Sequence, residues 1–356
     1  MLFAKKITFI YLCICLFCLI IIFKEIAGGY TQPIKDEKGD IIQESITSLE
    51  KVMLGDMEQW ILIRGKDIKN PILLWLHGGP GAAQMPISYY FNSSLEETFT
   101  VVHWDQRGAG KSNPGDFDEE TMRIEQFICD AHQLTKYLQT RFGKEKIYLL
   151  GHSWGAKLGI LLAEEYPEDY YAYIAVSQPV DTKMSNEVAY GWLKEQAEDK
   201  KNKKDIVLLN ELELSQLEDH KNYVVFAGLV DRYGGGMDIG MGKLATIALR
   251  APEYRLSDYI RWIRGASRGS GPMWEQYIDT NPIERVTALS LPIYFFSGRK
   301  DYNTPFELVG QYYIKLNAPV GKQLVVFEES AHAPFMAEPE KFYQEMLRVK
   351  EETYPY

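Results

Sequence analysis

Short apolar runs alternate with amphipathic segments along most of the chain. Residues 72–76, 147–150 and 171–176 are continuous apolar runs, which are typical of strands buried on both faces of a sheet. Residues 121–141 carry apolar residues at helical spacing. Strands that alternate with helices predict an α/β fold, in which helices cover both faces of a mostly parallel sheet.

Further strands are expected on either side of these runs. Residues 45–54 and 57–64 alternate in polarity around a Gly-Asp pair, which predicts a β-hairpin. Strands are expected again at 292–296 and 323–327. The helix between these two strands is expected to begin at Thr304, whose side chain would cap it.

The pattern changes between the two parts of this expected sheet. Residues 178–288 contain long charged and amphipathic stretches, such as 187–218, and a Gly-rich break at 234–236. We interpret 178–288 as a helical lid inserted into the sheet domain, and the term lid is used for these residues below. The core domain would then consist of residues 31–177 and 289–356.

The N-terminus carries a separate hydrophobic signal. Residues 7–23 are apolar and uncharged, and Lys5 and Lys6 precede them. This arrangement predicts an uncleaved membrane anchor within residues 1–30, with the catalytic domain outside the cytoplasm. Secretion after cleavage of a signal peptide is the alternative. Residues 31–44 are polar and would tether the anchor to the domain.

Charge and cysteine content narrow the classes of partner. The chain has 356 residues and a formal net charge of −10, which argues against nucleic acid as the main partner. Three of its four cysteines lie in the apolar N-terminal segment, so only Cys129 remains elsewhere and no disulfide can form within the domain. Cys129 is expected to be a small core residue of an amphipathic helix.

A strand, a sharp turn and a helix are expected around Ser153. Residues 151–155 have the sequence Gly-His-Ser-Trp-Gly, directly after the apolar run 147–150 and before a plausible helix. In this G-x-S-x-G elbow the turn exposes the serine hydroxyl above the sheet, and the next amide N–H, that of Trp154, points to the site of attack. Ser153 is therefore the candidate nucleophile.

A serine hydroxyl needs a base, and the base needs a group that orients it. Asp301 follows the expected strand 292–296, and His332 follows the expected strand 323–327. The order Ser153, Asp301, His332 is the order of a nucleophile-elbow triad. The Gly-rich loop 77–81 follows another strand, and it would supply the amide of Gly79 as the second oxyanion donor beside that of Trp154.

Three motifs together resemble the α/β-hydrolase family of proline iminopeptidases. They are His-Gly-Gly-Pro-Gly at 77–81, Asp-Gln-Arg-Gly-Ala-Gly-Lys-Ser at 105–112 and Gly-His-Ser-Trp-Gly at 151–155. The resemblance extends over about residues 45–350. It implies an α/β-hydrolase fold, a helical cap over the site, and the same site residues: Ser153, Asp301 and His332 as triad, with the Gly79 and Trp154 amides as oxyanion hole.

Two features depart from that family. His152 precedes the serine, where iminopeptidases commonly carry glycine. In the family, cap glutamates recognise the free amino group of an N-terminal proline, but residues 272–275 keep only part of the family's Trp-x-x-Trp-Glu stretch. Glu275 is the candidate substrate-binding residue, and the other possible amine anchors in the lid are Glu211, Glu213 and Asp231.

These residues predict a serine hydrolase that acts through an acyl-enzyme. The resemblance favours release of N-terminal proline, or a similar small residue, from short peptides. An esterase acting on small acyl compounds is the alternative, and a membrane-tethered binding module without catalysis is a third. An acid cluster in the cavity would favour peptides, and an apolar lid would favour esters. No metal or organic cofactor is expected, because no ligand spacing or phosphate-binding pattern is present.

Overall fold

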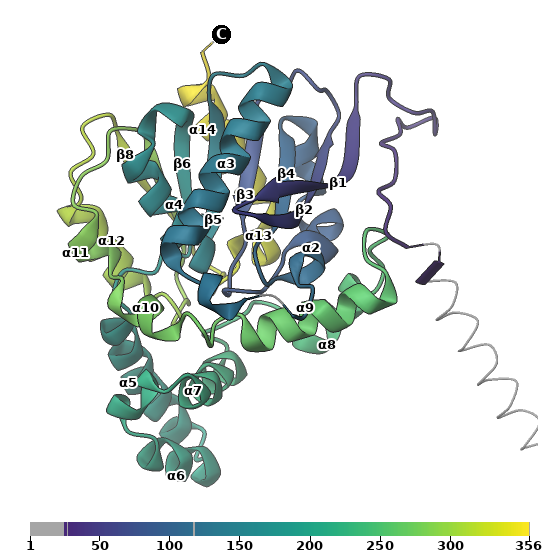
Figure 1. The fold of residues 1–356 in the computed structure, drawn as a ribbon. Helices are drawn as coiled ribbons and strands as arrows, with labels where there is room; N and C mark the ends of the chain where they lie inside the picture. Colours follow the sequence, from purple (N-terminus) through teal and green to yellow (C-terminus); the bar gives the residue numbers. More distant parts are fainter. Residues whose placement is uncertain (1–24, 27, 117, 356) are drawn as a thin grey trace, which may run out of the picture.

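A computed structural model describes residues 25–26, 28–116 and 118–355. Its centre is an eight-stranded sheet in the order β1-β2-β4-β3-β5-β6-β7-β8. The first two pairs in this order, β1 with β2 and β2 with β4, are antiparallel, and all the other neighbours are parallel. The predicted α/β class with a mostly parallel sheet is confirmed (Figure 1).

The strands lie close to the apolar runs of the sequence. The hairpin has the expected turn, because Leu54 pairs with Met57 across Gly55 and Asp56. The strands are β1 (Ile46–Leu54), β2 (Met57–Gly65), β3 (Ile72–Leu76), β4 (Thr100–Asp105), β5 (Ile147–His152), β6 (Tyr170–Val176), β7 (Ile293–Gly298) and β8 (Lys322–Phe327).

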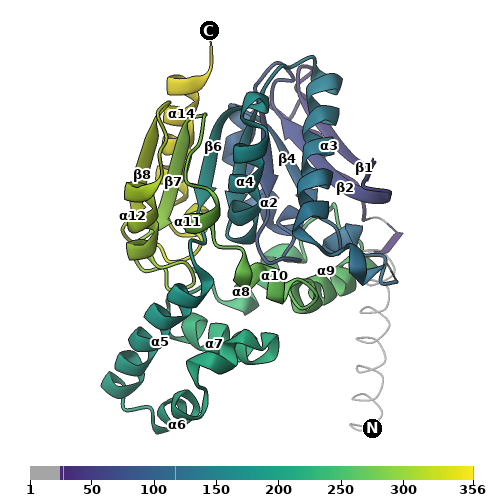
Figure 2. The ribbon, with the colours of Figure 1, turned by 60° about the vertical axis from the view of Figure 1, so that its left-hand side comes forward.

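Helices cover both faces of the sheet (Figures 1 and 2). On one face lie α3 (Ile124–Phe142), α4 (Trp154–Glu165) and α12 (Phe306–Lys315), and on the other lies α14 (Pro339–Thr353). Strand β3 shows how both faces are buried, because Leu74 and Leu76 pack in one apolar cluster and Leu73 and Trp75 in the other. The site therefore rests on a rigid, fully packed support.

The lid helices lie between β6 and β7 in the chain, at the end of the sheet where the parallel strands finish (Figures 1 and 2). Helices α5 to α7 have an apolar cluster of their own, which includes Leu193, Leu209 and Phe226. The lid helices are α5 (Thr182–Asp199), α6 (Lys203–Glu211), α7 (His220–Tyr233), α8 (Met241–Ala248), α9 (Leu256–Arg268), α10 (Trp274–Asp279) and α11 (Pro282–Arg285), with the 3₁₀ turn η5 (Leu214–Glu218).

Short helices and turns complete the chain. Two of them border the site, since α2 follows the Gly-rich loop 77–81 and α13 follows His332. They are α2 (Met85–Phe91), α13 (Pro334–Ala337), η1 (Ser93–Glu97), η2 (Gly110–Ser112), η3 (Glu119–Thr121) and η4 (Pro167–Asp169).

Two local expectations are wrong. Thr304 does not cap the helix after β7, because α12 begins at Phe306 with Pro305 in the cap position, and the Thr304 hydroxyl bonds to Asp301 instead. Cys129 is exposed rather than part of the core. It lies on α3, whose buried positions include Ile128 and Ala131, so helical periodicity directs Cys129 away from the sheet.

The apolar segment 7–23 lies outside the described residues, so the anchor and the extracytoplasmic location stay predictions. Within residues 25–26, 28–116 and 118–355, no helix has both the length and the apolar character that crossing a bilayer requires. Part of the expected tether, 31–44, folds back on itself through a bridge between Lys35 and Ile41.

The contact between α4 and the sheet gives a stability prediction. A Cβ at Gly155 would lie 2.1 Å from the Leu76 carbonyl oxygen, whereas a Cβ at Gly310 in α12 would meet no atom within 4 Å. We expect Gly155→Ala to lower the free energy of unfolding by about 1–3 kcal/mol through overpacking. Gly310→Ala should raise it by about 0.4–1 kcal/mol, because it removes chain entropy from the unfolded state.

Urea denaturation of both variants measures the difference. Equal free energies of unfolding for the two variants would contradict the close approach of α4 to β3.

Candidate active site

Ser153 lies at the junction of β5 and α4 in a conformation that few side chains adopt. Its φ is 55° and its ψ is −117°. The Ser153 N–H donates to the Val176 carbonyl oxygen at 3.0 Å, which fixes the turn to the end of β6. Glycine at 151 permits the turn, since a Cβ there would lie 2.2 Å from the Gly155 carbonyl oxygen. The elbow thus holds the Ser153 hydroxyl at the mouth of a cavity.

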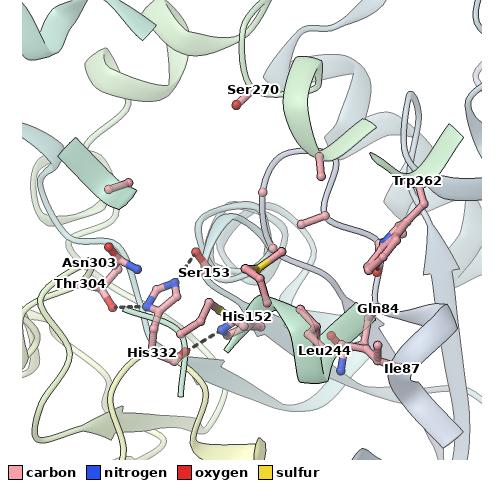
Figure 3. A pocket seen from close by; sticks show the side chains of 18 of the residues that line it. Gln84, Ile87, His152, Ser153, Leu244, Trp262, Ser270, Asn303, Thr304 and His332 are labelled. Carbon is pink, nitrogen blue, oxygen red and sulfur yellow. Dashed lines mark hydrogen bonds between the residues drawn. The ribbon is translucent and has the colours of Figure 1, made fainter. Parts of the chain in front are cut away.

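His332 connects Ser153 with Asp301. Its Nε2 lies 2.9 Å from Ser153 Oγ, and its Nδ1 lies 2.9 Å from Asp301 Oδ2. Figure 3 shows the imidazole between Ser153 and Thr304, with its ring nitrogens toward both. The structure therefore brings together the three residues that the sequence placed after three separate strands. With a proton on Nδ1, Nε2 is free to accept the serine proton.

The Asp301 carboxylate is buried and fully oriented. One oxygen, Oδ1, accepts the backbone N–H groups of Asn303 and Thr304, both at 2.9 Å. The other, Oδ2, accepts the Thr304 hydroxyl at 2.6 Å as well as the His332 ring. These donors leave the carboxylate one orientation, the one that faces His332.

The two charges of this pair support each other. Burial alone would lower the pKa of His332, but the Asp301 carboxylate outweighs it and raises this pKa above its ordinary value. Burial likewise favours the protonated Asp301, yet His332 lowers the pKa of that carboxyl. A protonated His332 is therefore well stabilised next to Asp301. This is the state that a base enters when it takes a proton from serine.

His152 and Ser177 hold the backbone of His332. The carbonyl oxygen of His332 accepts His152 Nε2 at 2.8 Å and the Ser177 hydroxyl at 3.0 Å. Burial lowers the pKa of His152 to about 3, so this ring is neutral and donates from Nε2. The sequence singled out His152 only as a departure from the family, and it gave no signal for Ser177.

The expected oxyanion loop is tied to the elbow by Gln106. The side-chain amide of Gln106 makes two bonds: its Nε2 donates to the His77 carbonyl oxygen at 3.1 Å, and its Oε1 accepts the Trp154 indole N–H at 2.9 Å. Gly79 lines the cavity next to Ser153, and the Trp154 N–H is at the first position of α4, where helical amides have no intrahelical partner. Gly79 therefore lines the same cavity as Ser153, and the Trp154 N–H directly follows Ser153 in the chain; the oxyanion hole formed by these two amides stays a prediction.

The loop 105–112, which follows β4, is held by buried polar and charged groups. Arg107 Nε donates to Asp130 at 3.0 Å, and the Lys111 N–H donates to Asp105 at 2.8 Å. The hydroxyl of Tyr254, from the lid, also bonds to Asp105, whose pKa burial raises to about 7. These contacts make Asp105 and Arg107 part of the frame of the site.

A cavity of about 530 Å³ extends from Ser153 under the lid (Figure 3). Among the side chains that the structure describes, no Asp, Glu, Lys or Arg lines it. Apolar and aromatic groups from both sheet domain and lid make up most of its wall: Ala82, Ala83, Ile87, Tyr223, Ala227, Met237, Met241, Leu244, Trp262, Ile263, Ala266, Trp274, Tyr277 and Met336. Its polar side chains near His332 are His152, Ser153, Asn303 and Thr304.

The structure does not place Glu275 in this cavity. Glu275 is exposed on α10, whereas Trp274, Tyr277 and Ile278 are buried on the opposite side of that helix. The other possible anchors, Glu211, Glu213 and Asp231, are exposed as well, and none of them lines the cavity. A fragment of a motif suggested Glu275, but the apolar spacing of its neighbours already pointed Glu275 outward.

Metal chemistry has no ready ligand set in the part of the chain that the structure describes. No group of three or more His, Cys, Asp or Glu side chains there is arranged to hold a metal ion. The groups that the structure places beside the cavity to act on a bound molecule include the Ser153 hydroxyl and the His332 imidazole.

Residues 71–339 match the alpha/beta hydrolase fold family, and the chain belongs to that family. It is 32% identical over 309 residues to "Probable aminopeptidase YbaC" of Bacillus subtilis (strain 168), a match that covers 86% of this chain and 97% of that protein. It is 26% identical over 278 residues to a proline iminopeptidase of Heyndrickxia coagulans, covering 77% of this chain and 88% of that protein.

Solved structures show the same fold. The crystal structure of proline iminopeptidase from Mycobacterium smegmatis superposes with a TM-score of 0.65 at 21% identity, covering 86% of this chain and 98% of that chain. The protein is therefore an alpha/beta hydrolase-fold enzyme with aminopeptidase relatives, and the resemblance seen in the sequence is confirmed.

The contrast between His332 and His152 gives a pH prediction. We expect His332 to titrate above the ordinary value of 6.5 because Asp301 stabilises its charged form, and His152 to stay neutral down to about pH 3. As the pH falls through the pKa of His332, the ring gains a proton and can no longer accept one from Ser153. The value of kcat/KM should fall with it.

Histidine ring NMR resolves the two residues, with His332→Gln to assign the signals. A His332 resonance that titrates below 6.5, or a His152 resonance that titrates near neutrality, would contradict the arrangement.

Proposed function

We propose that this enzyme is a serine hydrolase that cleaves acyl bonds through an acyl-enzyme. The observation that carries the proposal is the continuous chain of 2.9 Å contacts from Asp301 through His332 to Ser153. In the first step Ser153 Oγ bonds to the acyl carbon while His332 Nε2 takes the hydroxyl proton. Asp301 stabilises the imidazolium that results.

The amides of Gly79 and Trp154 would stabilise the negative oxygen that develops on the acyl carbon. His332 then gives its proton to the leaving amine or alcohol, whose bond to the acyl carbon breaks. A water molecule attacks the acyl-enzyme, with His332 again as base, and releases the acid and free Ser153.

Release of an N-terminal residue from short peptides is the first candidate activity. Its support comes from relatives, one named a probable aminopeptidase and others named proline iminopeptidases. The apolar wall around Ser153 suits proline or another small apolar residue at the cleaved bond.

The lining of the cavity favours a second candidate. A free N-terminal amine is charged at neutral pH, and no described carboxylate lines the cavity to pair with it. Burying an unpaired charge is costly. Esters or amides of uncharged apolar acids avoid this cost, so a hydrolase of such acyl compounds fits the same triad.

Two chromogenic substrates separate these candidates. Proline p-nitroanilide tests the aminopeptidase, and p-nitrophenyl butyrate tests the apolar acyl hydrolase. We expect Ser153→Ala to abolish turnover of whichever substrate the enzyme uses. Glu211→Gln, which alters an exposed lid carboxylate, should leave that turnover unchanged. Turnover that survives in Ser153→Ala would refute the proposed nucleophile.

The role of Asp301 gives a separate prediction. Asp301→Asn keeps the size of the side chain but removes the charge that orients His332 and stabilises its protonated form. We expect kcat to fall by about 10⁴-fold, since loss of the acidic triad member has an effect of that order. Steady-state kinetics on the preferred substrate measures the loss. A kcat as high as that of the surface variant Glu211→Gln would exclude Asp301 from the mechanism.

A further inference from the structure

The loop that carries His332 is hydrogen-bonded to the lid through three successive amides. The N–H of Ala331 donates to Asp238 Oδ1 at 2.6 Å, and the N–H of Ala333 donates to Asp238 Oδ2 at 2.7 Å. Between them, the N–H of His332 donates to the Gly236 carbonyl oxygen at 3.0 Å. The Asp238 carboxylate of the lid therefore binds the backbone amides on both sides of His332.

The same lid segment also contacts the loop of Asp301. The Gly235 carbonyl oxygen accepts the N–H of Tyr302 at 2.8 Å, and the Tyr302 ring stacks on Trp192 of α5 at a centroid distance of 3.9 Å. The loop of Asp301 and the loop of His332 are thus both hydrogen-bonded to residues 235–238 of the lid. These residues include Gly235 and Gly236 of the Gly-rich break at 234–236, which the sequence showed but did not explain.

This segment is tightly folded against its own helix. The carboxylate of Asp231, on α7, accepts the N–H of Met237 at 2.8 Å. A Cβ at Gly236 would lie 1.7 Å from Asp231 Oδ1, and a Cβ at Gly235 would lie 2.7 Å from the Trp192 ring. Glycine at both positions permits the lid backbone to come within hydrogen-bonding distance of the two loops.

Met237, within this lid segment, also forms part of the substrate cavity. The Met237 side chain lines the cavity, while its neighbours Gly236 and Asp238 bind the backbone around His332. A group bound against Met237 therefore rests on the segment that holds the base.

We propose that Asp238 is a positioning residue, which holds His332 within hydrogen-bonding distance of Ser153 by clamping the amides of Ala331 and Ala333. The inference rests on the proposed role of His332 as the base. It makes the lid part of the machinery that aligns the triad, in addition to covering the cavity. A carboxylate is required, because both of its oxygens act as acceptors and neither can be replaced by a donor.

Asp238→Asn is the first test. The new amide group would direct a donor at one of two backbone N–H groups, which releases one side of the loop. We expect kcat/KM to fall by about tenfold to a hundredfold, since a small misplacement of a catalytic group has effects of this order. Glu211→Gln removes a lid carboxylate of equal charge that is exposed at the end of α6, and it should leave kcat/KM unchanged.

The pH profile distinguishes positioning from a general loss of folded protein. Three carboxylates, those of Asp301, Asp231 and Asp238, favour the charged form of His332 and raise its pKa. The nearby His152 ring is also titratable, but it is neutral above about pH 3. Removal of the Asp238 charge should move the acidic limb of kcat/KM to lower pH. A smaller fraction of folded enzyme would lower the profile without moving this limb.

A second variant covers the case in which Asp238→Asn does not fold. Asp238→Ala leaves a space beside the two amides, and formate carries a carboxylate that can enter it. We expect formate to restore part of the lost kcat/KM in Asp238→Ala and to have no such effect on the wild type.

Labelling of Ser153 by an organophosphonate separates failure of this inference from failure of the proposed function. If the wild type is labelled at Ser153 and Asp238→Asn reacts at the same rate with the same pH profile, the clamp has no positioning role. If the wild type itself is not labelled at Ser153, the proposed mechanism is wrong, and the inference falls with it.

Discussion

The close packing of α4 against the ends of β3 and β5 determines where the Ser153 hydroxyl and the Trp154 amide lie. Ser153 keeps a positive φ, which costs a residue with a side chain about 1–3 kcal/mol, because the surrounding backbone leaves it no alternative. Gly151 and Gly155 allow that backbone to approach, and the bond to Val176 prevents relaxation. Since the Trp154 amide and the Ser153 hydroxyl belong to one turn, a shift of α4 would move the proposed nucleophile and the proposed oxyanion donor together.

The other half of the site is assembled around this fixed point from distant parts of the chain. Asp301 lies on the loop after β7, and His332 lies on the loop after β8. Each loop continues from a strand of the sheet and is hydrogen-bonded to the lid. His152 and Ser177 bind the His332 carbonyl oxygen, whereas Asp238 binds the amides on either side of that residue. His332 is thus held through its backbone, which leaves its ring available for the proposed proton transfer.

The sequence predicted the sheet, and it indicated the three residues of the proposed triad, because both depend on local patterns. Each triad residue follows an apolar run, and parallel strands deliver such residues to one edge of a sheet. Gln106, Ser177 and Asp238 could not be found in this way, because their bonds join residues 29 to 155 positions apart and no periodicity marks a polar residue for a distant backbone partner. Thr304 looked like a helix cap because Pro305 and a helical stretch follow it, and this local pattern did not show that its hydroxyl bonds to the Asp301 carboxylate three residues earlier.

Three methionines, Met237, Met241 and Met336, form part of the cavity wall. Thioether side chains are unbranched and polarisable, so they adapt to guests of different outline more readily than branched side chains do. Such a wall distinguishes substrates weakly by their shape. It distinguishes them more strongly by the cost of removing their bound water, because a molecule that enters the apolar cavity loses its hydration shell. Oxidation to methionine sulfoxide would add polar oxygens to this wall. The range of accepted substrates would then depend on the redox history of the enzyme as well as on its fold.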